Sequence, residues 1–124
     1  TITDHGKLQG TASYMSPEQI NRDHSINHRT DVYSLGAILY EILTGRTPFV
    51  GEKVHQVISS TLNDDPLTPT EISSQHMPAV LEQVAMRCLQ KDPDNRFDSM
   101  AHLLRELQQD WAADLMRPAS KITE

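Results

Sequence analysis

The sequence is poor in cysteine and in apolar residues. It has a single cysteine, Cys88, among 124 residues, which excludes an internal disulfide and a zinc site built from several thiolates, so nothing indicates an oxidising compartment. Hydrophobic residues make up 37%, aromatic residues 5%, and there are only five glycines. With the glycines counted, the apolar share is about 41%, slightly below the roughly 45–50% that is usual in globular domains. The shortfall predicts an incomplete or unusually exposed domain.

The chain also lacks an excess of positive charge. Eleven Lys and Arg oppose seventeen Asp and Glu, a net charge of −6, which argues against a nucleic-acid partner. The sequence contains no apolar run long enough to span a bilayer and no signal-peptide pattern. We therefore expect a cytoplasmic protein with no membrane segment in this chain. Because the first residue is Thr1 rather than Met, we expect a piece of a longer protein, for which an anchor elsewhere stays open.

Helical signals dominate the rest of the sequence, and no stretch shows convincing strand alternation. Ser16, Pro17 and Gln19 form a capping-box pattern that starts a short helix. Further helices are expected at 31–44, 52–62, 77–90 and 97–115, with a loop over 63–76. The sequence therefore predicts an all-α chain.

Residues 31–44 are the most informative segment. Apolar side chains cover nearly every side of the expected helix, Thr30 is placed to cap it and Gly45 to stop it. A helix that is apolar all round is buried all round, and fourteen residues are too few to cross a membrane. The pattern predicts a central core helix. Gly36 within it indicates close backbone packing, since glycine costs a helix roughly 1 kcal/mol relative to alanine.

Two later stripes at helical spacing predict the elements that pack on this core. The first holds Val80, Val84 and Cys88, and its cysteine is expected to be a buried structural residue. The second predicts one long last helix from Phe97, Met100, Ala101, Leu104, Leu107, Trp111 and Leu115.

Three strings in a fixed order carry a family resemblance. They are GTASYMSPEQ at 10–19, DVYSLGAILYEILTGRTPF at 31–49 and KDPDNRF at 91–97. Together they resemble the C-terminal lobe of a Hanks-type serine/threonine protein kinase. The motif Tyr-Met-Ser-Pro-Glu-Gln within them resembles bacterial members of the family. The resemblance implies an all-α fragment that holds the large-lobe helices around a buried central helix. It divides the chain into the end of the activation segment with the substrate loop (1–15), the helical lobe (16–112) and a tail or linker (113–124).

The resemblance also implies roles for individual residues. Gly10, Thr11 and Tyr14 would position the Ser or Thr hydroxyl of a protein substrate. Glu18, in a Ser-Pro-Glu string where the family has Ala-Pro-Glu, would pair with Arg96, because a buried carboxylate needs a partner. Asp31 would anchor the backbone of the catalytic loop and should hydrogen-bond to a buried group.

Weaker candidates lie in polar stretches. Thr1 and Thr3 fall where activation-loop phosphorylation sites lie in the family, and a phosphate there could order the loop through arginine pairs. His24 and His28 stand four apart, a spacing that metal ligands use on a helix, but no third ligand is evident, so we expect no metal site. Ser34 lacks the glycine two residues before it that a nucleophile elbow needs.

The phosphate-handling motifs of a kinase do not occur in the sequence. It holds no G-x-G-x-x-G before a strand, no His-Arg-Asp and no Asp-Phe-Gly. In the family, these motifs contact ATP and magnesium and provide the catalytic base. The resemblance thus implies that ATP and Mg are used by the intact parent kinase, and that this chain alone binds neither and holds no catalytic residue. Its expected partners are protein substrates and the missing N-terminal part of the kinase domain.

Two other interpretations stay open. A non-catalytic pseudokinase or protein-interaction module could keep the same helices without phosphate transfer. An unrelated helical bundle with chance motif matches would leave Asp31 exposed or Glu18 far from Arg96.

Overall fold

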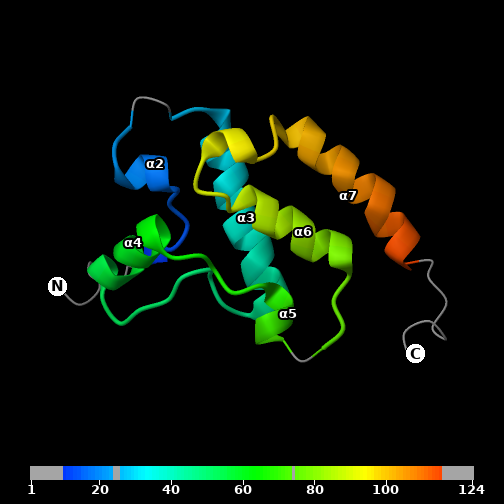
Figure 1. Ribbon diagram of the computed structural model, residues 1–124, viewed down its shortest axis with the longest axis horizontal. Helices are drawn as coiled ribbons and strands as arrows, with labels where there is room; N and C mark the ends of the chain where they lie inside the picture. The colour runs from blue at the N-terminus through cyan, green and yellow to red at the C-terminus, as the bar shows by residue number, and fades with distance from the viewer. Residues whose placement is uncertain (1–9, 24–25, 74, 116–124) are drawn as a thin grey trace.

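The computed structural model describes residues 10–23, 26–73 and 75–115, and every regular element within these ranges is helical. The elements are α2 (Pro17–Ile20), α3 (His28–Thr44), α4 (Val54–Asn63), α5 (Pro69–Ile72), α6 (Ala79–Cys88), the 3-10 turn η1 (Pro93–Asn95) and α7 (Met100–Leu115). In Figure 1, α3 runs through the middle of the molecule, α6 packs against it, and α7 lies beyond α6. The all-α prediction is confirmed.

The central helix α3 starts earlier than predicted. Its N-cap is Asn27, whose side-chain oxygen accepts the backbone N–H of Arg29 at 2.8 Å, which gives the free N–H groups of the first turn a partner. Thr30 is therefore not the cap but a buried residue of the first turn. The end is as predicted, because Gly45 adopts a left-handed conformation with φ 84°.

Complete burial of α3 was a wrong prediction. Leu35, Ile38 and Ile42 are 36%, 45% and 73% exposed. Their spacing of three and four residues places them on one side of the helix. The described elements pack on the other sides, and this apolar stripe is left uncovered by them.

A short helix, α5, lies in the segment that was predicted to be a loop. Thr68 accepts the backbone N–H of Glu71, the Glu71 carboxylate accepts the N–H of Thr68, and Pro69 occupies the first helical position. This is the same capping-box pattern that correctly predicted α2 at Ser16. The signal was thus present in the sequence, and the proline-rich composition around it obscured it.

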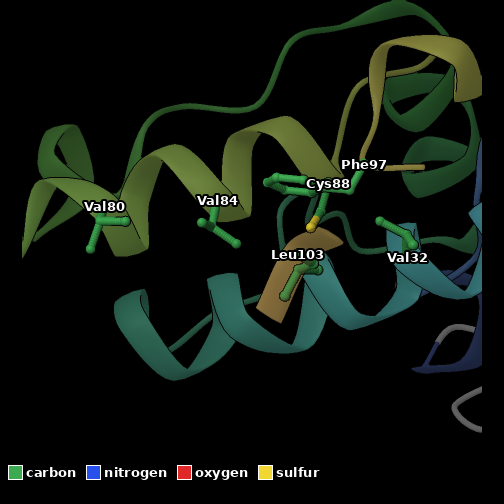
Figure 2. Close-up of a cluster of buried hydrophobic side chains, with 6 residues drawn as sticks. All are labelled: Val32, Val80, Val84, Cys88, Phe97 and Leu103. Atoms are coloured by element: carbon green, nitrogen blue, oxygen red, sulfur yellow. The ribbon is translucent and has the colours of Figure 1, made fainter. Parts of the chain in front are cut away.

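The main core joins α3, α6 and α7. Figure 2 shows its six buried side chains, which are Val32, Val80, Val84, Cys88, Phe97 and Leu103. The predicted α6 stripe is confirmed. Of the last stripe, Phe97 is buried and Leu107 packs against this core as predicted, but Leu103, which the stripe left out, is 2% exposed, whereas Leu104 is 52% exposed. The cause is that α7 begins only at Met100, so Phe97 packs from the preceding loop and does not set the helical register. The side chains of Trp111 and Leu115 lie outside the described part.

Gly36 confirms the prediction of close packing. A Cβ built on Gly36 would overlap the Cβ of Cys88 and lie 3.4 Å from that residue's backbone carbon. Glycine is thus the residue that lets α3 and α6 approach each other at this crossing.

We expect the thiol of Cys88 to be unreactive in the folded protein. Burial raises the pKa of its thiol to about 12, and the positive charges of Arg96 and Arg87 lower it only in part, so almost no thiolate forms at neutral pH. Ellman's reagent at pH 8 should label Cys88 only as fast as the fold opens, and immediately in denaturant. Rapid labelling without denaturant would show that α3 and α6 do not pack as described.

Candidate functional site

The segment Gly10–Tyr14 is tied to α3 by two hydrogen bonds. The Tyr14 hydroxyl donates to Oε1 of Glu41 at 2.6 Å, and the Ser34 hydroxyl donates to the backbone oxygen of Tyr14 at 3.2 Å. The hydrogen bond to Glu41, followed by burial and the Glu41 charge, raises the pKa of Tyr14 above its ordinary value. Gly10 and Thr11 remain exposed beside this anchor. The arrangement presents a surface segment whose end is fixed to the central helix.

Glu41 is a residue of this candidate site that sequence reasoning missed. It is the single charged side chain among residues 32–44 of a helix that is otherwise largely apolar. A lone carboxylate in such a helix needs a polar partner when it is partly buried. That signal was readable, but the identity of the partner, 27 positions earlier in the chain, was not.

Glu18 and Arg96 form a buried ion pair. Arg96 Nη1 lies 2.6 Å from Oε2 of Glu18, and Nη2 lies 2.8 Å from Oε1. Glu18 is 4% exposed and Arg96 1% exposed. The two-pronged geometry is the strongest that an arginine and a carboxylate can form. The structure thus brings together two predicted residues that are 78 positions apart in the sequence.

The remaining donors of Arg96 hold three backbone segments. Nη1 donates to the oxygen of Arg29 at 3.0 Å, Nη2 to that of Lys91 at 3.2 Å, and Nε to that of Gln90 at 2.7 Å. With the two bonds to Glu18, all five guanidinium N–H groups have partners. Arg96 therefore joins α2, the start of α3 and the segment after α6 around one side chain.

The carboxyl of Glu18 stays ionised to a lower pH than an ordinary glutamate, because its pKa is lowered. Burial alone would raise its pKa, but hydrogen bonds from Arg96, from its own backbone N–H and from the Thr30 hydroxyl, which lies at 2.8 Å, together lower it below the ordinary 4.5. A lowered pKa contributes stability above the unfolded value, and this stability is lost as the pH falls through the folded value.

We therefore expect the free energy of unfolding to fall as the pH drops below about 4.5, the ordinary pKa of a glutamate. Urea unfolding between pH 7 and pH 3 measures this slope. The slope should be shallower for Glu18→Gln and unchanged for Glu52→Gln, whose carboxylate is exposed. Equal slopes for the wild type and Glu18→Gln would contradict the prediction.

Asp31 differs from expectation. It is exposed in the first turn of α3, and among the described residues it has no hydrogen-bond partner, so the expected bond to a buried group is absent there. Position 31 precedes Leu35 by four residues and so lies on the same side of α3 as the uncovered apolar stripe. Its expected role as the anchor of a catalytic loop stays a prediction.

The structure assigns no functional site to the weaker candidates. Thr1, Thr3 and His24 lie outside the described residues. The His28 ring nitrogen Nε2 lies 2.5 Å from the backbone oxygen of Asp98. This side chain therefore hydrogen-bonds to the loop that precedes α7. In the described ranges no three His, Cys, Asp or Glu side chains gather closely enough to hold a metal ion.

The helical fold and its buried Glu18–Arg96 pair define a kinase lobe, and the comparisons with known proteins agree. The family described as protein kinase domain matches residues 3–111. The chain therefore belongs to the protein kinase domain family. The Hanks-type assignment is confirmed, and the alternative of an unrelated bundle is wrong even though Asp31 is exposed.

Several bacterial relatives are similar to this chain. It is 39% identical over 107 residues to "Serine/threonine-protein kinase PknB" of Mycolicibacterium smegmatis, covering 86% of this chain and 17% of that protein. It is 35% identical over 107 residues to a probable serine/threonine-protein kinase of Clostridium acetobutylicum, covering 86% and 16%. The chain thus spans about one sixth of the length of these relatives.

A solved structure supports the fold. The twitchin kinase region from C. elegans aligns with a TM-score of 0.69 and 23% identity, covering 83% of this chain and 17% of that one. In the described residues no helix is both long and apolar enough to cross a membrane.

Proposed function

We propose that this chain is the substrate-positioning part of a protein serine/threonine kinase. The observation that carries the proposal is the anchoring of Gly10–Tyr14 on α3 through Tyr14, Glu41 and Ser34. In the family, this segment receives the acceptor hydroxyl. A fixed segment lowers the entropy cost of aligning a hydroxyl for attack, which is a large part of catalysis in phosphoryl transfer. Thr11, exposed next to the anchor, is the residue that would meet the substrate.

ATP and magnesium belong to the rest of the intact kinase in this proposal. The sequence lacks the glycine-rich, His-Arg-Asp and Asp-Phe-Gly motifs, and the described side chains offer no carboxylate cluster for a divalent ion. The residues present therefore do not fit the cofactor. We expect the purified 124-residue chain to transfer no phosphate from ATP, and transfer by it would overturn this part of the proposal.

The uncovered face of α3 is where the N-terminal part of the kinase domain would dock. Leu35, Ile38 and Ile42 lie there, and together with Leu103 and Leu107 of α7 they line a hollow of about 130 Å³. Exposed apolar patches of this kind mark surfaces that another element covers. Asp31 on the same face would then gain the buried partner that it lacks among the described residues.

The docking face can be tested by one substitution in two settings. In the polypeptide of natural length, Ile38→Lys should strongly lower the melting temperature, because it places a charge under the docked part. In the 124-residue chain it should leave the melting temperature unchanged or reduce aggregation. Val50→Lys, at a residue 54% exposed elsewhere, is the control and should have little effect in either setting. Equal effects of Ile38→Lys in both would show that nothing covers this face.

Substrate positioning is tested by kinetics of the natural-length polypeptide. Its transfer of labelled phosphate from ATP to a peptide with one serine should fall at least tenfold in kcat/KM with Thr11→Ala, and less with Thr11→Ser. Tyr14→Phe should lower kcat/KM for the peptide and leave KM for ATP unchanged, because it frees the segment and not the nucleotide site. Phosphopeptide mass spectrometry of the same material would show whether Thr1 and Thr3 are modified.

The non-catalytic alternative predicts a different result. A folded natural-length polypeptide that transfers no phosphate to any protein or peptide under these conditions would establish an interaction module. Thr11→Ala would then have no kinetic effect to measure, and the proposal of a substrate-positioning role would be wrong.

A further inference from the structure

A second hollow is lined by residues of the α4–α5 connection, of the second half of α6 and of the segment after α6, elements that Figure 1 places in the fold. Its volume is about 490 Å³, within the range of roughly 300–1,000 Å³ in which proteins bind ligands. Its lining consists of Asp65 and Pro66 from that connection, Met86 from α6, and Leu89, Gln90, Lys91, Asp92 and Asn95 from the segment after α6.

The carboxylates of this hollow form no close ion pair. Within the described ranges neither Asp65 nor Asp92 takes part in an ion pair, and Asp92 accepts only the backbone N–H of Asp94, at 2.9 Å. Both side chains belong to exposed residues. The hollow therefore offers negative charge to a ligand.

Lys91 does not cancel this charge by direct contact. Its Nζ donates to the backbone oxygen of Thr61 at 2.8 Å and lies 4.8 Å from the ring centre of Phe49. Burial lowers the pKa of Lys91, while the charges of Asp65 and Asp64 act in the opposite direction. The ammonium group is thus bound to α4 and meets Asp65 only through its charge, so two carboxylates oppose one ammonium in the lining of the hollow.

The floor of the hollow is apolar. Leu89 is 3% exposed, and Met86 and Pro66 are half-buried. The exposed residues Gln90 and Asn95 add amide groups to the lining. A ligand that fits has an aliphatic portion for the floor and a cation for the rim, which are the features of an arginine or lysine beside a leucine-like residue.

One wall is held in place by the buried ion pair. The backbone oxygens of Gln90 and Lys91 accept hydrogen bonds from Arg96, the partner of Glu18. The wall is therefore formed before any ligand arrives, and a preformed site loses less conformational entropy on binding.

We infer that this hollow docks a segment of a partner protein in which a basic residue lies next to an aliphatic one. The charge of Asp65 and Asp92 attracts the basic side chain, and the floor made by Met86 and Leu89 receives its neighbour. The docking needs no ATP and no phosphate transfer, so it stands or falls separately from the proposed kinase role.

The test uses the polypeptide of natural length and a fluorescein-labelled peptide of alternating arginine and leucine, followed by anisotropy. Asp65→Lys should weaken binding at least tenfold, and Asp65→Asn about fivefold, because a charge-assisted contact is lost. Glu52→Lys makes the same charge change at an exposed residue outside the hollow and should alter binding less than twofold. A photoreactive version of the peptide should cross-link to residues 86–95.

Each contrary outcome overturns the inference. Equal weakening by Asp65→Lys and Glu52→Lys would mean that only the net charge attracts the peptide. Cross-links outside the hollow would place the site elsewhere. Equally tight binding of a peptide with glutamine in place of arginine would remove the charge argument. Displacement by spermine at the concentration of the peptide would show a site for small polycations rather than for a protein segment.

Discussion

Arg96→Met should lower the free energy of unfolding by about 3–5 kcal/mol, the usual cost of leaving a buried charge without its partner. Glu18 would remain 4% exposed, and of the side-chain hydrogen bonds to its carboxylate only that from Thr30 would persist. The backbone oxygens of Arg29, Lys91 and Gln90 would lose donors as well. Urea unfolding followed by circular dichroism measures the loss, which is a large part of the stability of a small domain.

Two further variants distinguish the loss of the ion pair from a nonspecific loss of stability. Arg29→Met removes an arginine whose ion pairs with Asp94 and Asp98, at 4.0 and 3.7 Å, are loose and partly exposed, and it should cost less than about 1 kcal/mol. The double variant Glu18→Leu with Arg96→Met leaves no charge stranded and should regain part of the loss. If Arg96→Met were no worse than Arg29→Met, the pair would not stabilise the fold.

Gly36→Ala should destabilise the protein even though alanine favours helices. The gain in helix propensity is about 1 kcal/mol. Against it, the new methyl group would overlap the Cβ of Cys88 and press on the backbone of α6, and such overpacking costs about 1–3 kcal/mol. Because the obstacle is a Cβ fixed to a helix and not the flexible end of a side chain, we expect the cost to lie near the upper end of this range, which leaves a net loss of about 2 kcal/mol by thermal or urea unfolding.

Gly10→Ala is the matched control for this prediction. A Cβ at Gly10 meets no heavy atom within 4 Å, so the change in free energy of unfolding should stay within about 1 kcal/mol of zero and is expected to be favourable. A Gly36→Ala protein as stable as the Gly10→Ala protein would show that α3 and α6 are farther apart than the structure places them.

The sequence was a good guide where the signal was local. Capping by Ser16 and termination at Gly45 depend on residues within one turn of each other, and both were predicted. The missed start of α3 at Asn27 and the missed helix at Thr68 were local signals too. They were missed because Asn, Thr and Pro also occur in turns and loops. The composition therefore predicted a loop where the capping residues indicated a helix.

Register and exposure were harder to predict. Leu103 and Leu104 are neighbours of the same type, and which one is buried depends on where α7 begins and how it lies on α6. Likewise, Ile38 and Val32 are both β-branched apolar residues of one helix, but one is 45% exposed and the other 0%. Sequence periodicity identifies apolar positions, and only the packed neighbours decide which of them are covered.

By itself, the sequence determined the helical class, the start of α2, the end of α3, the close packing at Gly36 and, through three ordered strings, the protein kinase family. Only the tertiary structure decided that Arg96 uses all five donors, that Tyr14 is tied to Glu41 and that acidic residues border a preformed hollow. The physical reason is distance along the chain. Capping and helical periodicity act within a few residues, whereas the Tyr14–Glu41 and Glu18–Arg96 contacts join side chains that are 27 and 78 positions apart and meet only when the helices pack.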